Sequence, residues 1–233
     1  MRSVPRSVRI IGATSAVVAF GASLLDIVLS MLPGWGPEAV PVSASGWLVQ
    51  LAGQPALGLR NLDLLNAGVS LAMVPMFIAL AWLLLDRSPA LVSTGLAFAL
   101  IGAALFVGHN VALPMYGLAT DYTAALAAGE EAPLIGAAES LLAQGRHGSF
   151  GAAPGFLISE LGTLLVALGM WRVRRGRWLA VAGSFGALVL GVYTVWSLSG
   201  AAPLWIAAAG GIAMMGWLSG IAALLLRGGF RRA

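Results

Sequence analysis

The sequence predicts an all-α fold: a polytopic membrane helix bundle with six transmembrane helices and short interfacial helices in the outer loops. Hydrophobic residues make up 59% of the 233 residues, charged residues only 9%, and the mean hydropathy is +0.92. A soluble domain carries about a quarter charged residues, so this composition indicates a surface that mostly faces lipid. Six apolar stretches of roughly 20 residues also match the ~30 Å hydrocarbon core of a bilayer.

The apolar stretches predict the helices in order along the chain. Pro154 fits the first turn of the fourth helix, where proline is tolerated. The first stretch is not typical of a signal peptide, because it is long and contains Asp26. All six belong to one integral membrane domain, residues 1–233, since the segments between them are too short to hold a core of their own. The predicted spans are 8–32, 62–85, 90–117, 156–171, 178–199 and 204–226.

Two long connections, residues 33–61 and 118–155, lie on the same side of the predicted bundle. Each contains apolar residues at helical spacing, which is typical of an amphipathic helix in the membrane interface. We expect these helices to cover the outer ends of the bundle. The apolar positions are Trp47, Leu48 and Leu51 in the first connection, and Leu134, Ile135, Ala138, Leu141 and Leu142 in the second.

All 13 basic residues are arginine, and their distribution predicts the orientation of the chain. Cytoplasmic loops of membrane proteins carry the excess of basic residues. An even number of spans then places both termini in the cytoplasm, and the absence of lysine suggests a GC-rich bacterium and its plasma (inner) membrane. Eleven arginines fall on one side (2, 6, 9, 87, 172, 174, 175, 177, 227, 231 and 232) and two on the other (60 and 146).

These arginines lie at helix ends, where the bilayer explains them, so the net charge of +4 does not indicate nucleic-acid binding. The expected partners are the lipid bilayer and a lipophilic small molecule, and the oligomeric state, including a homo-oligomer, stays open. No cysteine is present, so a thiolate metal site or a haem attachment motif is not expected. We predict no cofactor and no metal site, because one histidine with carboxylates has no diagnostic spacing here.

Several polar side chains fall within the predicted spans, all toward the outer face. Because each helical residue adds a rise of about 1.5 Å, we expect these side chains to lie at about the same depth in the membrane. Intramembrane ionisable residues are expensive and by default mark a functional site. We therefore predict a polar pocket that opens outward, formed by Asp26, Asp63, Asn66, His109, Asn110, Glu160, Tyr193 and Trp196.

The residue types suggest acid–base chemistry on a lipophilic molecule such as an alkene, epoxide or isoprenoid. A carboxylic acid in apolar surroundings can stay protonated and act as a general acid. We assign this role to Glu160, with Asp63 or His109 as the base. Asp26, Asn66, Asn110, Tyr193 and Trp196 would form the wall of the pocket. Whether the chain is an enzyme stays open.

Other interpretations stay open as well. Asp63 could cap its helix or pair with Arg60, Asp26 could be an interhelical contact, and His109 could be a packing histidine. His147 and Glu139 fit a solvated loop. Instead of a binding protein, the chain could be a small proton- or ion-coupled transporter, or a structural membrane subunit. A transporter needs a path through the inner half of the bundle, and the predicted spans are apolar in that half.

One stretch resembles a known group of proteins. Residues 110–115 (Asn-Val-Ala-Leu-Pro-Met) are followed by Asp121-Tyr122, by Ala-Ala-Glu at 137–139 and by Gly-Ser-Phe at 148–150; residues 61–66 (Asn-Leu-Asp-Leu-Leu-Asn) also fit. Over residues 45–195 the chain is similar to a bacterial six-helix integral membrane family of unknown function (domain of unknown function, 4386 type). The resemblance implies a multi-pass membrane protein and no established reaction.

Overall fold

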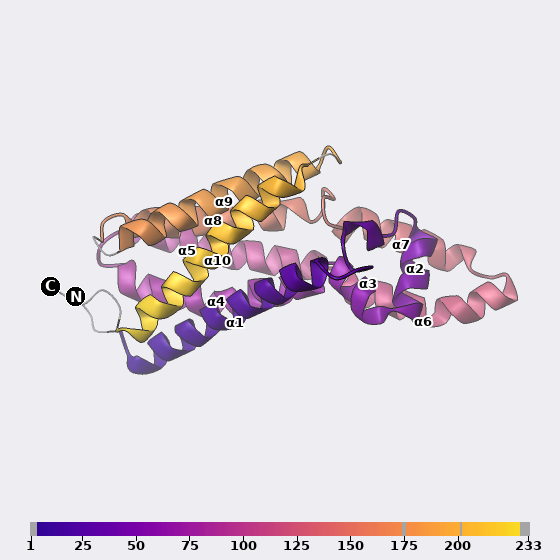
Figure 1. Ribbon diagram of the computed structural model, residues 1–233, viewed down its shortest axis with the longest axis horizontal. Coiled ribbons are helices and arrows are strands. Elements are labelled where there is room, and N and C mark those ends of the chain that lie inside the picture. Colours follow the sequence, from indigo (N-terminus) through magenta and orange to yellow (C-terminus); the bar gives the residue numbers. More distant parts are fainter. Residues whose placement is uncertain (1–3, 174–175, 201, 229–233) are drawn as a thin grey trace.

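The computed structural model describes residues 4–173, 176–200 and 202–228 (Figure 1). Six long helices form a bundle: α1 (Arg6–Ser30), α4 (Leu64–Leu84), α5 (Pro89–His109), α8 (Ala153–Met170), α9 (Arg177–Ser197) and α10 (Leu204–Leu226). The remaining elements gather at one end and form a cap: η1 (Pro37–Ala39), α2 (Ala44–Gly53), α3 (Pro55–Asn61), α6 (Ala112–Ala128) and α7 (Ala132–Gly145). The part of the chain described here contains no strand, which confirms the all-α prediction.

In the described parts of the chain, six segments are long and apolar enough to cross a membrane. Five of them are single bundle helices, and the sixth is the combined segment Pro89–Ala128, which contains α5 and α6. The protein is therefore a multi-pass membrane protein, as predicted. The start of α1 and the end of α10 lie at the end of the bundle that is opposite the cap (Figure 1).

Glycine lets α5 and α8 pack with their backbones in contact. A Cβ added to Gly162 would overlap the backbone of Ala99, and one added to Gly102 would overlap the backbone of Ser159. Gly155 lies equally close, because its Cβ would be 2.7 Å from the Phe106 nitrogen. Small residues that permit close approach are the usual basis of helix association in membranes.

Substituting one of these glycines should therefore separate the two helices. We expect Gly102→Ala to lower the free energy of unfolding by about 1–3 kcal/mol, as overpacking commonly does. Gly108 on the same helix has open space where a Cβ would lie, so Gly108→Ala should be neutral or slightly stabilising. Thermal unfolding of both variants in detergent measures the difference, and equal effects would contradict the close contact.

The half of the bundle that is remote from the cap is filled by large apolar side chains. Met76, Leu80 and Leu84 of α4 are fully buried, and so are Trp217 and Leu225 of α10. Phe77 packs against Trp217 with ring centroids 6.0 Å apart. This half is thus a close-packed core.

The cap contains a second hydrophobic cluster, which the sequence interpretation did not expect. Trp47, Leu48 and Leu51 of α2 are fully buried there against Met115 and Ala119 of α6. The expectation that the connecting segments are too short to hold a core is wrong. The reason is that residues 112–117, which were predicted to end the third span, instead form the first part of α6 and pack within the cap.

The third span ends earlier than predicted, at His109 instead of residue 117. Asn110 is extended, with ψ 121°, and its side-chain oxygen accepts a hydrogen bond from the Ala112 nitrogen at 3.2 Å. Its amide nitrogen donates to the Leu62 carbonyl at 2.9 Å. Pro114 lies in the first turn of α6, where its missing N–H breaks no helical hydrogen bond, and α5 and α6 are two separate helices.

The two amphipathic segments are helical, as predicted, and their apolar positions face the cap cluster. Their arrangement differs from a flat cover, because the α6–α7 hairpin extends beyond the ends of α1 and α4 (Figure 1). The apolar face of each of these helices is buried against another cap helix instead of against lipid, which explains why the helices do not lie flat over the bundle.

Candidate functional site

A cavity of about 730 Å³ lies where the cap meets the bundle. Its polar lining comes from the end of α1, from α3 and the start of α4, from the link between α7 and α8, and from the end of α9. The polar and aromatic residues that line it are Asp26, Ser30, Trp47, Arg60, Asn61, Asp63, Asn66, Arg146, His147, Tyr193 and Ser197.

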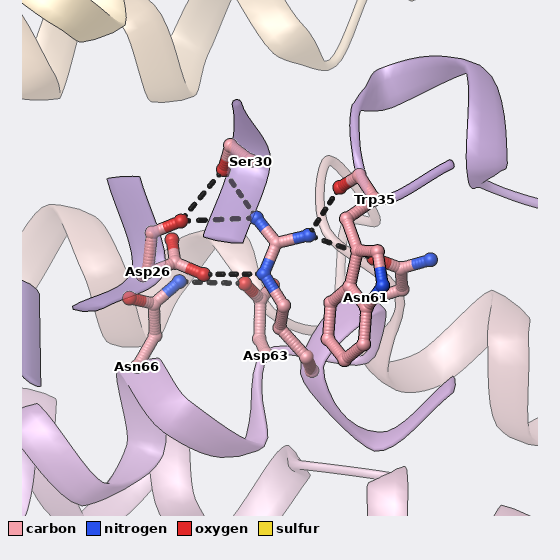
Figure 2. Close-up of polar contacts among 7 residues, drawn as sticks. Asp26, Ser30, Trp35, Asn61, Asp63 and Asn66 are labelled. Carbon is pink, nitrogen blue, oxygen red and sulfur yellow. Dashed lines mark hydrogen bonds and ion pairs between the residues drawn. The ribbon is translucent and has the colours of Figure 1, made fainter. Parts of the chain in front are cut away.

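Arg60 connects α3 to the end of α1 and to the loop that follows. Its Nε lies 2.8 Å from Oδ1 of Asp26, and its Nη1 donates to the Trp35 carbonyl at 2.7 Å. It also donates to the hydroxyl of Ser30 (Figure 2). The Arg60 side chain is only 13% exposed. Asp26 is thus an interhelical contact, which was one of the two interpretations left open.

Asp63 occupies the junction between α3 and α4 in a left-handed conformation, with φ 61°. The residue is 8% exposed, and each carboxylate oxygen has a different partner. Oδ1 accepts from Asn66 Nδ2 at 2.8 Å (Figure 2), and Oδ2 lies 3.0 Å from Nδ1 of His147. Asp63 therefore neither caps α4 through its side chain nor pairs with Arg60, which were the two alternatives left open for it.

His147 belongs to the link between α7 and α8, and it packs between two aromatic rings. The ring centroid of Phe156 lies 5.4 Å away, and that of Tyr193 lies 6.0 Å away. The negative charge of Asp63 raises the pKa of His147 above its ordinary value of 6.5, although burial acts in the opposite direction. The contact joins a cap link to the start of α4.

This contact predicts a pH dependence of stability. Because the folded pKa of His147 is raised, its pair with Asp63 stabilises the fold fully below pH 6.5. The contribution is lost as the pH rises through the raised pKa. We expect the melting-temperature difference between wild type and His147→Gln to shrink between about pH 5.5 and 9. A difference that grows with pH would contradict the pair.

His109 and Asn110 do not line the cavity. His109 is half-buried, and its Nδ1 lies 2.8 Å from the Leu105 carbonyl of its own helix. The side chain of Asn110 accepts a hydrogen bond at the start of α6, as described above. The expectation that these two side chains converge with Asp63 is wrong, because a position along the sequence does not give the rotation of α5 or the place where it ends.

Glu160 and Trp196 also lie outside the cavity. Both line a separate groove of about 590 Å³ between α8 and α9, together with apolar residues such as Leu157, Leu164 and Val192. On α9, Tyr193 and Ser197 face the cavity, whereas Val192 and Trp196 face the groove. The predicted convergence of Glu160 with Asp63 and His109 on one cavity is therefore wrong.

Four predicted residues do come together at the cavity: Asp26, Asp63, Asn66 and Tyr193. The sequence interpretation missed Arg60, Arg146 and His147 as cavity residues. A signal for the two arginines was available in the sequence, because they are the only arginines on the predicted outer side. His147 follows Arg146 directly, yet no periodicity relates it to Asp63, which is 84 residues away.

The described residues contain no group of three or more His, Cys, Asp or Glu side chains that could hold a metal ion. No family model matches the chain, and no curated protein and no solved structure matches it either. The similarity to the six-helix family therefore stays a prediction, and the function has to be argued from the site itself.

Proposed function

We propose that the protein lies in a bacterial plasma membrane with both termini in the cytoplasm and the cap outside. Six arginines lie at the end opposite the cap (6, 9, 87, 172, 177 and 227), against Arg60 and Arg146 at the cap end. Arg2, Arg174, Arg175, Arg231 and Arg232 lie outside the described residues. The positive-inside rule supports this orientation.

We propose further that the cavity binds the anionic head group of a lipophilic small molecule or lipid. The observation that carries this proposal is Arg146, which lines the cavity while its guanidinium makes no hydrogen bond or ion pair with the described part of the chain. Guanidinium groups bind carboxylates and phosphates with two parallel hydrogen bonds. The other arginine, Arg60, is already engaged by Asp26.

Apolar residues complete the cavity and suit the rest of such a ligand. Val40, Val42 and Leu198 line it together with the polar groups, and Val42 is almost entirely exposed. Ligand pockets usually combine apolar walls with a few placed polar groups. An amphiphile could therefore place its head beside Arg146 and its apolar part against this rim.

His147 is the residue that supports acid–base processing of the ligand. Asp63 engages Nδ1 and so orients the ring, while Nε2 makes no hydrogen bond to any described residue. A histidine oriented in this way by a carboxylate is a common general acid or base. The proposed acid–base pair is thus His147 with Asp63 as its positioning residue, in place of Glu160 and His109.

The packed inner half of the bundle favours binding over transport. Met76, Leu80, Leu84 and Trp217 fill the space that a substrate would have to cross. Close-packed interiors of this kind leave few voids larger than a water molecule.

Native mass spectrometry of protein released from its membrane tests the proposed ligand. Wild-type protein should retain an anionic amphiphile at a defined stoichiometry, and Arg146→Gln should reduce its occupancy at least tenfold. Arg177→Gln is the matched control, because Arg177 is an exposed arginine at the opposite end of the bundle. Equal retention by the two variants, or no retained anion in wild type, would refute the proposal.

A further inference from the structure

Glu160 is the one acidic residue of the described chain that lies in the middle of a bundle helix. It follows the first residue of α8 by seven positions, which places it about 10 Å along the helix. One of its carboxylate oxygens, Oε2, is buried and has no hydrogen-bond partner among the described residues. A buried carboxylate without a partner is strongly unfavourable.

The groove that Glu160 lines is otherwise apolar. Leu157, Leu161 and Leu164 of α8 form one wall, and Leu188 and Val192 of α9 form the other. Leu161, Leu188 and Val192 are between 42% and 55% exposed, so the groove opens to the surface that faces lipid. Trp196 also lines it and is 45% exposed.

We propose that this groove binds a lipophilic cation that enters from the lipid phase. The proposal uses none of the residues of the cavity at the cap, so it stands independently of the function proposed above. It gives Glu160 a ligand-binding role that differs from the general acid expected from the sequence.

Three features of the groove favour the binding of a lipophilic cation. Once ionised, the carboxylate of Glu160 places a negative charge where the surrounding dielectric is low, and a cation compensates this charge better than any neutral molecule. The indole of Trp196 offers an aromatic face, which attracts cations and does so best among the aromatic residues. The leucine and valine walls bury an apolar body. A phospholipid with its head group at the interface would not bring its charge to this depth.

Gly191 provides the space in the groove. It lines the groove on α9, and a Cβ at this position would meet nothing within 4 Å. A large side chain at position 191 would fill the groove and leave the carboxyl group of Glu160 in place. The position therefore allows a test of occupancy that is separate from the test of charge.

The test uses the purified protein in nanodiscs of phosphatidylcholine and tritiated tetraphenylphosphonium as the probe. Wild type should bind the probe saturably in a scintillation proximity assay. Glu160→Gln and Gly191→Leu should each weaken binding at least tenfold. The controls are Glu139→Gln, which removes an exposed carboxylate of the cap, and Gly68→Leu, which fills an open position on α4; both should bind as wild type does.

Each outcome is decisive. Absence of saturable binding to wild type overturns the proposal, and so does equal affinity of wild type and Glu160→Gln. A loss in Glu139→Gln as large as that in Glu160→Gln would show that only general surface charge attracts the probe. If Glu160→Gln does not fold, Gly191→Leu decides between a groove site and none. Competition by unlabelled dodecylamine, and not by dodecanol, should confirm that the charge is recognised.

Discussion

Replacing Arg60 by methionine is expected to lower the free energy of unfolding by about 2–3 kcal/mol, somewhat less than removing one partner of a fully buried ion pair costs, because this pair is half-buried. Arg60 is 13% exposed and engages Asp26, Ser30 and the Trp35 carbonyl together. Its loss leaves the Asp26 carboxylate without its partner and frees the loop after α1 from α3. Reversible unfolding in mixed micelles, followed by circular dichroism, measures the change.

The control for this experiment is Arg146→Met, which removes the other arginine at the cap end of the bundle. Arg146 is exposed and has no partner in the described chain, so its loss should change stability by no more than about 0.5 kcal/mol. Asp26→Asn combined with Arg60→Met should be less destabilising than the sum of the two single changes. Additive effects would contradict a direct ion pair.

Replacing Asp63 by alanine is expected to destabilise the protein by a similar amount, about 3 kcal/mol. The left-handed conformation, with φ 61°, is unfavourable for alanine by about 1–2 kcal/mol. Loss of the contacts to Asn66 and His147 adds about 1.5–3 kcal/mol, the range for hydrogen bonds to charged groups, before the chain relaxes. Both causes act at the junction between the cap and the bundle.

Two further variants at Asp63 separate the causes. Asp63→Gly relieves the backbone strain but loses both contacts, so it should be less destabilising than Asp63→Ala. Asp63→Asn tolerates the left-handed conformation and keeps one hydrogen bond, so it should be the mildest of the three. The same unfolding measurement ranks them, and an alanine variant as stable as the asparagine variant would show that neither cause operates.

The sequence predicts the bundle well because membrane spans leave a strong local signal. Five of the six spans correspond to single helices. The apolar residues at helical spacing that begin at Trp47 and Leu134 lie in α2 and α7. Depth is predictable for the same reason, since it follows from the rise per residue. Asp26, Asp63, Asn66 and Tyr193 do reach one cavity.

Helix rotation and loop contacts leave no such signal. The sequence places His109 and Glu160 along their helices, yet α5 turns His109 toward its own backbone and α8 turns Glu160 toward the groove. His147 reaches Asp63 only because α6 and α7 pack into a cap with its own core. Contacts of this kind depend on tertiary packing, which the periodicity of a single helix does not contain.

The cavity lined by Asp63 and His147 is expected to open on the outer side of the membrane. The chain has no cysteine, so a single Ser197→Cys substitution places one thiol at the cavity, and Arg177→Cys places one at the other end of α9. Membrane-impermeant maleimide on intact cells should label Ser197→Cys and should label Arg177→Cys only after lysis. The reverse pattern, or a Ser197→Cys thiol that reacts only after denaturation, would contradict an outward-opening cavity.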